Sequence, residues 1–314
     1  MAALVVRRLI GIVFVIFLVT VFVFLLLHLI PGDPARTILG MDATPEQVNA
    51  LRHELWLDRP ILTQYGHWLL NVFKGDFGRS TIYNRDVSAL LAERLPVTSY
   101  LSLFSIILSV LLGVTAGIIS AIRRGSALDQ TVSVLANTGI SIPPFWLGIL
   151  GIYGLGLKLG WLPIQGFIPP TVDFWQSTKQ IIMPVICMAV PAIAVLARQT
   201  RSSMLEVIRQ DYIRTAWAKG LKEPAVVLKH ALKNALIPVV TLLGLQVRIL
   251  IGGAVLVETV FNIPGMGRLM VQAVLDKDFV VVQGTVLLMT IVVALTNLLV
   301  DISYGWLDTR IRLE

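Results

Sequence analysis

Charged residues and cysteine are both scarce in this chain of 314 residues. Asp, Glu, Lys and Arg make up only 14% of the sequence, whereas soluble domains contain about 25% charged residues. The single cysteine, Cys187, lies within an apolar run, so one chain can form neither an internal disulfide nor a site with several thiolate ligands. Because 56% of the residues are hydrophobic, the composition predicts an integral membrane protein.

Signatures of catalytic and metal sites are also absent from the sequence. No phosphate-binding loop of the form G-x-x-x-x-G-K-[ST] occurs, so we do not expect the chain to hydrolyse ATP by that route. The sequence contains neither an H-E-x-x-H zinc motif nor a G-x-S-x-G nucleophile motif, and its four histidines share no metal-ligand spacing. We therefore expect no catalytic residue, no metal site and no cofactor in this chain.

The most prominent feature of the sequence is its long hydrophobic runs. A membrane-spanning helix needs roughly 20 predominantly apolar residues. The first candidate run is longer than the apolar core of a signal peptide and is followed by no small-x-small cleavage site, so we expect it to be retained as a helix. The fold class is therefore predicted to be all-α, a polytopic membrane protein with six transmembrane helices. The six runs are Leu9–Ile30, Val97–Ile122, Thr131–Leu157, Gln180–Ala197, Leu236–Val257 and Val280–Ile302.

Basic residues mark one side of the predicted membrane. Arg7 and Arg8 precede the first run, and Lys and Arg outnumber Asp and Glu in residues 198–235, whereas residues 31–96 have balanced charge. The positive-inside rule then places both termini and residues 198–235 in the cytoplasm, and residues 31–96 outside. Because the net charge of +7 lies at the edges of apolar runs, we expect no nucleic-acid partner.

The outer segment, residues 31–96, is predicted to contain two short helices. Thr44-Pro45-Glu46-Gln47 supplies an N-cap, a proline at the first helical position and a capping-box glutamine, which together predict a helix running towards Trp56. A second helix is expected from Pro60 to Phe73, ended by the glycines of Gly75-Asp76-Phe77-Gly78. The segment is interpreted as a packed lid at the membrane interface, with direct contact to a solute as the alternative.

Helix breaks and polar groups within the predicted spans favour a transporter over a rigid anchor. The third run contains the consecutive prolines Pro143 and Pro144, which remove backbone donors in mid-membrane. Arg248 lies about ten residues into the fifth run, near mid-depth at a rise of about 1.5 Å per residue. It either attracts an anionic group on the path or pairs with Glu258, Asp301 or a carboxylate of a partner subunit. The candidate pathway residues are Phe145, Trp146, Gln246 and Arg248.

One polar, basic segment, Asp211–Pro238, separates the fourth and fifth runs, and we call it the elbow. Its first residues alternate charged and apolar side chains, which predicts a short amphipathic helix lying on the membrane face. Gly220 is expected to end that helix in the left-handed conformation. A second short helix is expected from Leu221-Lys222-Glu223-Pro224, with the fifth membrane helix beginning at Pro238. Such an elbow suits a groove of another protein, and its charge also suits anionic lipid.

The elbow resembles the "EAA" coupling loop of ABC-importer permeases, in the version found in peptide and nickel permeases. Ala216 and Gly220 match the alanine and glycine of that motif, whereas Arg214 and Thr215 stand in place of its Glu and Ala. The resemblance extends over nearly the whole chain. Its further tracts are Val6-Arg7-Arg8, Pro31-Gly32-Asp33-Pro34, Leu57-Asp58-Arg59-Pro60, Gly75-Asp76-Phe77-Gly78-Arg79-Ser80, Arg94-Leu95-Pro96, Ser141-Ile142-Pro143-Pro144-Phe145-Trp146, Gly252-Gly253-Ala254-Val255, Glu258-Thr259-Val260-Phe261, Pro264-Gly265-Met266-Gly267-Arg268 and Asp308-Thr309-Arg310-Ile311-Arg312.

This resemblance implies a type I importer permease fold over residues 1–314, as a single multi-pass domain of the bacterial inner membrane. It implies that the chain is the first, B-type permease and that it pairs with a second homologous permease. The expected partners are two cytoplasmic ATPases, which would bind ATP and Mg²⁺, and an extracytoplasmic solute-binding protein. The residues expected to couple to an ATPase are Asp211, Tyr212, Arg214, Thr215, Ala216, Lys219, Gly220 and Leu221.

The resemblance favours peptides as the transported solute. Nickel complexes, glutathione, opines and oligosaccharides are the alternatives within the same class. A membrane scaffold whose basic elbow binds lipid, and a carrier driven by a proton or sodium gradient, are alternatives from other classes. Gly220 distinguishes the scaffold from the permease, because docking on another protein depends on the shape of the turn whereas lipid binding depends on charge.

Overall fold

The structure, a computed structural model, describes residues 2–28, 34–40, 43–54, 56–80 and 82–307. It comprises two compact units. Unit 1 combines Met1–Val97 with Gly265–Leu298, and unit 2 combines Thr98–Pro264 with Leu299–Glu314. The helices α5 and α13 each contribute to both units. The predicted tracts Pro31–Asp33 and Asp308–Arg312 lie outside the described residues, and a single permease domain over 1–314 stays a prediction.

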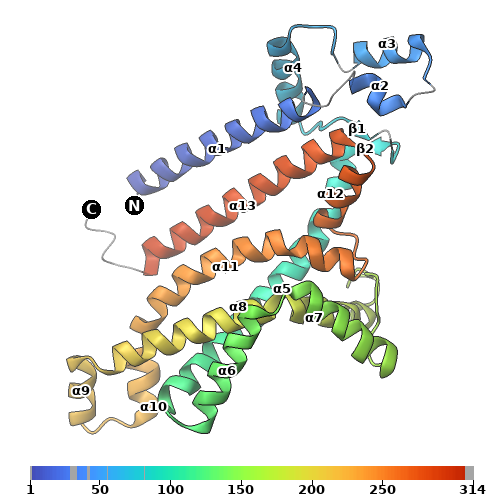
Figure 1. Cartoon of the computed structure of the whole chain (residues 1–314). Helices are drawn as coiled ribbons and strands as arrows, with labels where there is room; N and C mark the ends of the chain where they lie inside the picture. Colours follow the sequence, from blue (N-terminus) through green and yellow to red (C-terminus); the bar gives the residue numbers. More distant parts are fainter. Residues whose placement is uncertain (1, 29–33, 41–42, 55, 81, 308–314) are drawn as a thin grey trace. The chain divides into compact units, whose positions relative to one another are not determined.

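The described secondary structure is helical apart from one hairpin, which confirms the all-α prediction (Figure 1). The hairpin pairs Arg79 with Asp86 and Ser80 with Arg85. Unit 1 contains α1 (Ala2–His28), α2 (Pro34–Leu39), α3 (Pro45–Glu54), α4 (Ile61–Phe73), β1 (Arg79–Ser80), β2 (Arg85–Asp86), the start of α5 (Val87–Ile122), α12 (Met266–Leu275) and most of α13 (Phe279–Leu307). Unit 2 contains the rest of α5, α6 (Ala127–Ser141), α7 (Pro144–Gly151), the π-helix η1 (Ile152–Lys158), α8 (Phe174–Ile208), α9 (Asp211–Ala218), α10 (Glu223–Ala225), the π-helix η2 (Val226–Ala231) and α11 (Leu232–Val260).

Every predicted apolar run corresponds to a candidate membrane span, although the third is broken. Five described helices are long and apolar enough to cross a membrane, and the number reaches six if α6 and the helix that follows it form one span. That pair bends by 100° between Ser141 and Pro144. Two consecutive prolines without N–H groups explain why the helix cannot continue through this point. The prediction of a break in the third run is confirmed.

The start of the fifth membrane helix differs from the prediction. Pro238 lies inside α11, and helix runs without interruption from Glu223 to Val260. The second short helix of the elbow is therefore continuous with the membrane helix. A proline within a membrane helix removes one backbone donor, and neighbouring groups can satisfy the freed carbonyl, so Pro238 does not mark a helix end. Apolar runs locate the membrane-embedded part of a helix, and α8 and α11 both extend beyond it.

In unit 1, the local signals in residues 31–96 predicted α3 and α4 correctly, whereas α2 and the hairpin of β1 and β2 were not predicted. The Thr44 N–H donates to Gln47 Oε1 at 2.9 Å and the Gln47 N–H donates to Thr44 Oγ1 at 3.3 Å, which is the expected capping box at the start of α3. Helix α4 ends at Phe73, followed by Gly75 with φ of 82°. Its Tyr65 hydroxyl lies 2.9 Å from the Thr20 hydroxyl of α1, so α4 packs on the end of α1.

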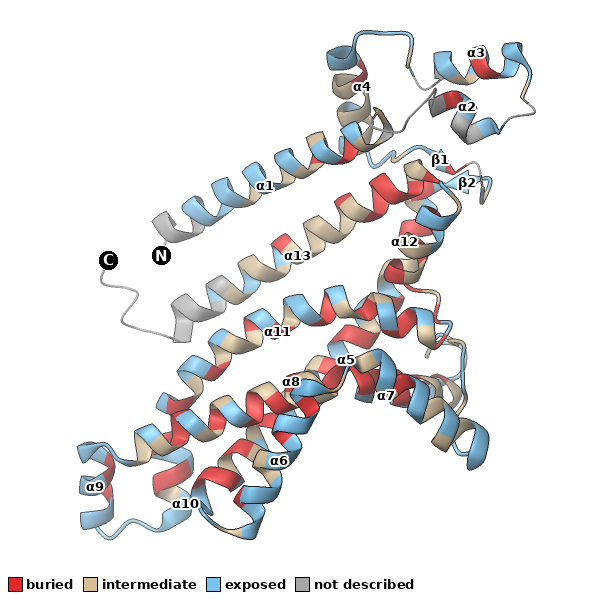
Figure 2. Ribbon diagram, in the orientation of Figure 1, coloured by how far each residue is buried: buried red, intermediate tan, exposed pale blue. Residues whose placement is uncertain are grey.

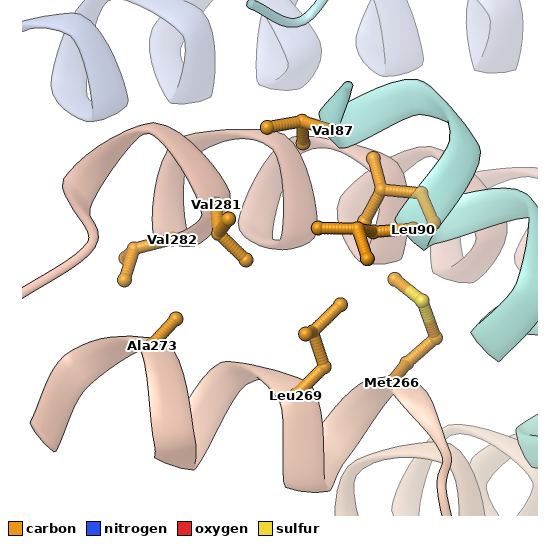
Figure 3. Packing of buried hydrophobic residues seen from close by; sticks show 8 residues of the cluster. Val87, Leu90, Met266, Leu269, Ala273, Val281 and Val282 are labelled. Carbon is orange, nitrogen blue, oxygen red and sulfur yellow. The ribbon is translucent and has the colours of Figure 1, made fainter. Parts of the chain in front are cut away.

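The core of unit 1 lies between α5, α12 and α13. Figure 3 shows Met266, Leu269 and Ala273 on one face of α12, directed towards Val281 on α13 and Leu90 on α5. This spacing of three and four residues is that of an amphipathic helix. Helix α12 was not predicted, because a helix of ten residues is too short to be found as a membrane span.

Unit 2 is built around α8, which packs against α5, α6, α7 and α11. Small residues let the backbones approach closely. A Cβ atom added at Gly117 of α5 would lie 2.6 Å from the Ala197 carbonyl oxygen of α8. Figure 2 shows the contrast in burial: buried residues are frequent along α8, whereas α1 is largely exposed along its apolar length. Exposed apolar side chains on α1 suit contact with lipid or with a partner subunit.

Candidate functional site

The first half of the elbow forms the predicted helix and turn. Helix α9 begins at Asp211 and ends at Ala218. Gly220 follows in the left-handed region with φ of 74°, and its N–H donates to the Trp217 carbonyl at 2.9 Å. No heavy atom lies within 4 Å of the position that a Cβ of Gly220 would occupy. The turn therefore needs glycine for its backbone conformation and not for lack of space.

The inner face of α9 connects the elbow to the long helices of unit 2. Ile213 and Ala216 are buried in a cluster with Met204 of α8, and with residues of η2, α11 and α5. The Asn234 side chain of α11 also donates to the Tyr212 hydroxyl at 2.8 Å. Helix α9 therefore packs on both α8 and α11. The other cluster members are Ala121, Val226, Val227, Ala231 and Ala235.

The outer face of the elbow carries most of the predicted coupling residues. Tyr212, Trp217 and Leu221 are large apolar or aromatic side chains that are exposed beside charged ones. Such a mixture of aromatic anchors and charges is typical of protein interfaces. Of the eight predicted coupling residues, Asp211, Tyr212, Arg214, Thr215, Lys219, Gly220 and Leu221 are exposed, whereas Ala216 is buried.

An ion pair that the sequence did not predict connects α6 to α8. The buried carboxylate of Asp129, in the first turn of α6, accepts hydrogen bonds from Arg201 Nε at 2.6 Å and Nη2 at 2.8 Å. It also accepts from the Gly125 N–H at 2.9 Å and from the Ser120 hydroxyl. Arg201 was expected only as one of the orientation charges, because a partner 72 positions away leaves no local signal.

A pocket of about 350 Å³ lies at the break, where α6 ends and α7 begins. We call it the break pocket. Gln246 contributes its only amide side chain, and is itself 7% exposed. The lining residues are Ile140, Ser141, Ile142, Pro143 and Pro144 from the break, Met188, Pro191 and Ala192 from α8, and Gln246, Ile249, Leu250 and Gly253 from α11.

Of the four predicted pathway residues, only Gln246 lines the break pocket. Phe145 and Trp146 begin α7 with exposed side chains, and Arg248 is exposed on α11. Arg248 forms no ion pair with any carboxylate that the structure describes. Glu258 is instead fully buried and accepts a hydrogen bond from the Thr98 hydroxyl. The side chain of Asp301, the other proposed partner, lies outside the described residues.

A second pocket, of about 470 Å³, lies within unit 1. It is lined by parts of α1, α3 and α4, by Trp56 and Leu57, by Asp76–Ser80, Asn84 and Asp86, and by the start of α13. The Trp56 ring stacks on the His67 ring at a centroid distance of 3.9 Å, and His28 Nε2 lies 3.0 Å from Gln64 Oε1. These contacts fit the interpretation of residues 31–96 as a packed lid, and direct contact with a solute stays an alternative.

Comparison with known proteins identifies the family. The model of the binding-protein-dependent transport system inner membrane component matches residues 113–313, and the model of its N-terminal part matches residues 1–103. A Brucella abortus (strain 2308) protein, whose name describes a peptide transport system permease protein, is 43% identical over 314 residues, covering 100% of both chains. The glutathione transport system permease protein GsiC of Escherichia coli (strain K12) is 42% identical over 308 residues, covering 98% of both.

The fold is shared with a solved transporter. The chain matches a structure titled as an inward-facing conformation of the MetNI methionine ABC transporter, with a TM-score of 0.58 and 21% identity, over 70% of this chain and 96% of that one. This likeness supports the predicted type I permease fold. A permease of this kind works with ATPase and binding-protein partners. The chain belongs to the binding-protein-dependent transport system inner membrane components, and is a multi-pass permease subunit of an ABC importer rather than an enzyme.

Proposed function

We propose that this chain carries peptides across the bacterial inner membrane, as the first permease of a heterodimeric pair. The observation that carries this proposal is the similarity to relatives named as peptide permeases, at 42–43% identity over 99–100% of this chain. Both termini and the elbow would lie in the cytoplasm, as the positive-inside rule predicts. ATP and Mg²⁺ would be bound by two ATPase partners, and a solute-binding protein would deliver the peptide from outside.

The elbow supplies a mechanical route from ATP to the pathway. Closure of the ATPase dimer would push on the outer face of α9, around Gly220. The buried Ile213 and Ala216 would pass this displacement to α8 and α11, because the elbow and these helices share one cluster. Both helices also line the break pocket. The permease would therefore alternate between inward- and outward-facing states as a two-state element driven by its partners.

The exposed pathway residues fit a route shared by two permeases. Phe145, Trp146 and Arg248 face away from the core of unit 2. A path that runs between two subunits is lined by residues that are exposed in each subunit alone. Arg248 would place a cation beside that path, near mid-depth, where it could attract the carboxylate of a peptide.

Glutathione is a second candidate, favoured by the relative named as a glutathione permease at 42% identity. Because glutathione is itself a tripeptide, the same pathway could admit it. Competition separates the two cases: a glutathione importer would take up labelled glutathione, and an excess of ordinary tripeptides would leave that uptake unchanged. A peptide importer would show the reverse preference.

The test of the proposed function is uptake of a labelled tripeptide into proteoliposomes that contain the complete importer. We expect uptake to require ATP, both permeases, the ATPases and the binding protein. Uptake by this chain alone, driven by a proton or sodium gradient, would contradict the proposal and favour a carrier. If the importer uses ATP but transports no peptide, the chain is still an ABC-importer permease, but the proposal that its substrate is a peptide is wrong.

A further inference from the structure

The break leaves backbone groups without helical partners beside a pocket. In an α-helix each N–H donates to the carbonyl four residues earlier. Pro143 and Pro144 have no N–H, so the carbonyl oxygens of Gly139 and Ile140 lose their helical donors. Carbonyls of a helix point along its axis towards the C-terminus, so these two acceptors point towards the break.

The start of α7 brings donors to the same place. The Pro143 carbonyl accepts from the N–H groups of Trp146 at 3.1 Å and Leu147 at 3.2 Å. The Phe145 N–H belongs to the first turn of α7, where N–H groups have no helical acceptor and point back towards the break. The positive end of the α7 dipole lies there too. The break therefore has acceptors on one side and a donor on the other.

Gln246 is a second, independent observation that points to a ligand at this place. Its side chain is 7% exposed and lines the break pocket from α11. It forms no hydrogen bond with any residue that the structure describes. An amide without a protein partner costs about 1–3 kcal/mol where neither water nor a ligand reaches it, and irregular backbone at membrane depth is tolerated only where it is buried in protein or lines a water-filled cavity. The pocket thus presents an amide that a ligand can satisfy.

We propose that the break pocket binds the main chain of the transported peptide, with Gln246 bonding one peptide unit and the break bonding the next. This inference rests on the proposed function. A peptide unit has one N–H donor and one carbonyl acceptor, and the pocket offers partners for both. The rest of the lining is apolar, including Met188, Ile249 and Leu250. The pocket therefore accommodates the side chains of the peptide without distinguishing one from another.

The size of the pocket sets how much peptide it holds. Its volume of about 350 Å³ is at the lower end of the range of roughly 300–1,000 Å³ for small-molecule sites. It therefore accommodates a short length of chain and not a whole oligopeptide. The importer should tolerate changes of the peptide side chains and be sensitive to changes of the peptide backbone.

The test compares four tripeptides in proteoliposomes of the complete importer, at saturating loaded binding protein. One is unmodified, one has a replaced side chain, and two are N-methylated, each at a different one of the two peptide bonds. Gln246→Leu removes the amide at nearly constant volume. Thr241→Val is the matched control, because Thr241 is exposed on the same helix and its hydroxyl donates only to the Ile237 carbonyl of its own helix.

We expect Gln246→Leu to lower uptake of the first two peptides about tenfold and to leave uptake of one N-methylated peptide unchanged. Gln246→Glu, which retains a hydrogen-bond acceptor, should lose less uptake than Gln246→Leu, and Thr241→Val should show the same uptake as the wild type. Uptake at the wild-type rate by Gln246→Leu, or an equal loss of uptake for every peptide, would contradict recognition of the peptide main chain by the break pocket. Either result would leave the proposal of peptide import intact. If Gln246→Leu fails to assemble, Gln246→Glu and Gln246→Asn provide the same comparison. A wild-type importer that carries none of the peptides would contradict the proposed function itself.

Discussion

Arg201 of α8 donates two hydrogen bonds to Asp129 of α6, from Nε at 2.6 Å and from Nη2 at 2.8 Å. The Asp129 side chain is 6% exposed and that of Arg201 is 30% exposed, so the pair is largely shielded from water. Because the Gly125 N–H and the Ser120 hydroxyl donate to the same carboxylate, the connection between α5 and α6 is fixed to α8. Helix α8 ends at Ile208, just before the elbow. The ion pair therefore fixes the position of the helix from which the elbow continues.

Asp129→Asn should destabilise the isolated chain by about 3 kcal/mol, because it leaves Arg201 partly buried without its counter-charge. Denaturant unfolding of the purified chain in detergent measures the change. Asp211→Asn is the control, because Asp211 pairs with Arg214 at the surface, where the two side chains are 97% and 73% exposed. Such surface pairs contribute only about 0–1 kcal/mol to stability. Equal losses in the two variants would contradict a structural role for the Asp129 carboxylate.

Gly220→Ala should cost about 1–2 kcal/mol, because an L-residue is strained at its φ of 74°. Gly160→Ala is a matched control, since Gly160 has φ of 65° and also has free space around the added Cβ. The two variants should lose similar stability in an unfolding measurement. Only Gly220→Ala, and more so Gly220→Leu, should reduce ATPase retention in a pull-down. Full retention of the ATPases by Gly220→Leu would favour the lipid-binding scaffold.

Gly117→Val should destabilise the packing of α5 on α8 by about 1–3 kcal/mol. The reason is that the added Cβ would lie 2.6 Å from both the Ala197 carbonyl and Thr200 Cβ. Gly252→Ala, on α11, has no atom within 4 Å of its added Cβ and should be neutral or stabilising by up to about 1 kcal/mol through helix propensity. Thermal unfolding of both variants measures the difference, and unchanged stability of Gly117→Val would contradict this packing of α5 on α8.

Local chemistry is what the sequence predicted well. The capping box of Thr44 and Gln47, the left-handed Gly220 and the break at Pro143 each depend on residues within a few positions. The Asp129–Arg201 pair was not predictable, because nothing in one sequence says which distant charge meets which. The continuity of α11 through Pro238 was also missed, since it depends on neighbouring helices that satisfy the freed carbonyl.

The relation between Gln246 and Arg248 could have been predicted. Two residues apart on an α-helix are separated by roughly 200° around its axis. They therefore face nearly opposite sides and cannot both line one narrow pocket. Gln246, Leu250 and Gly253 follow the spacing of one helix face, which is the face that lines the break pocket. Arg248 stays a prediction for a path between two subunits, whereas the periodicity of the helix places Gln246 at the break pocket.

The most direct test of ATP-driven coupling is cross-linking from the elbow in the complete importer. Cys187 is 4% exposed, so a cysteine placed by Lys219→Cys is the accessible thiol of this chain. A short cross-linker at that position should join this chain to an ATPase subunit, in a yield that changes when ATP is added. Lys158→Cys, at the end of η1, should give no such product. Cross-links from Lys219→Cys to lipid or to the second permease alone would contradict docking of the elbow on an ATPase.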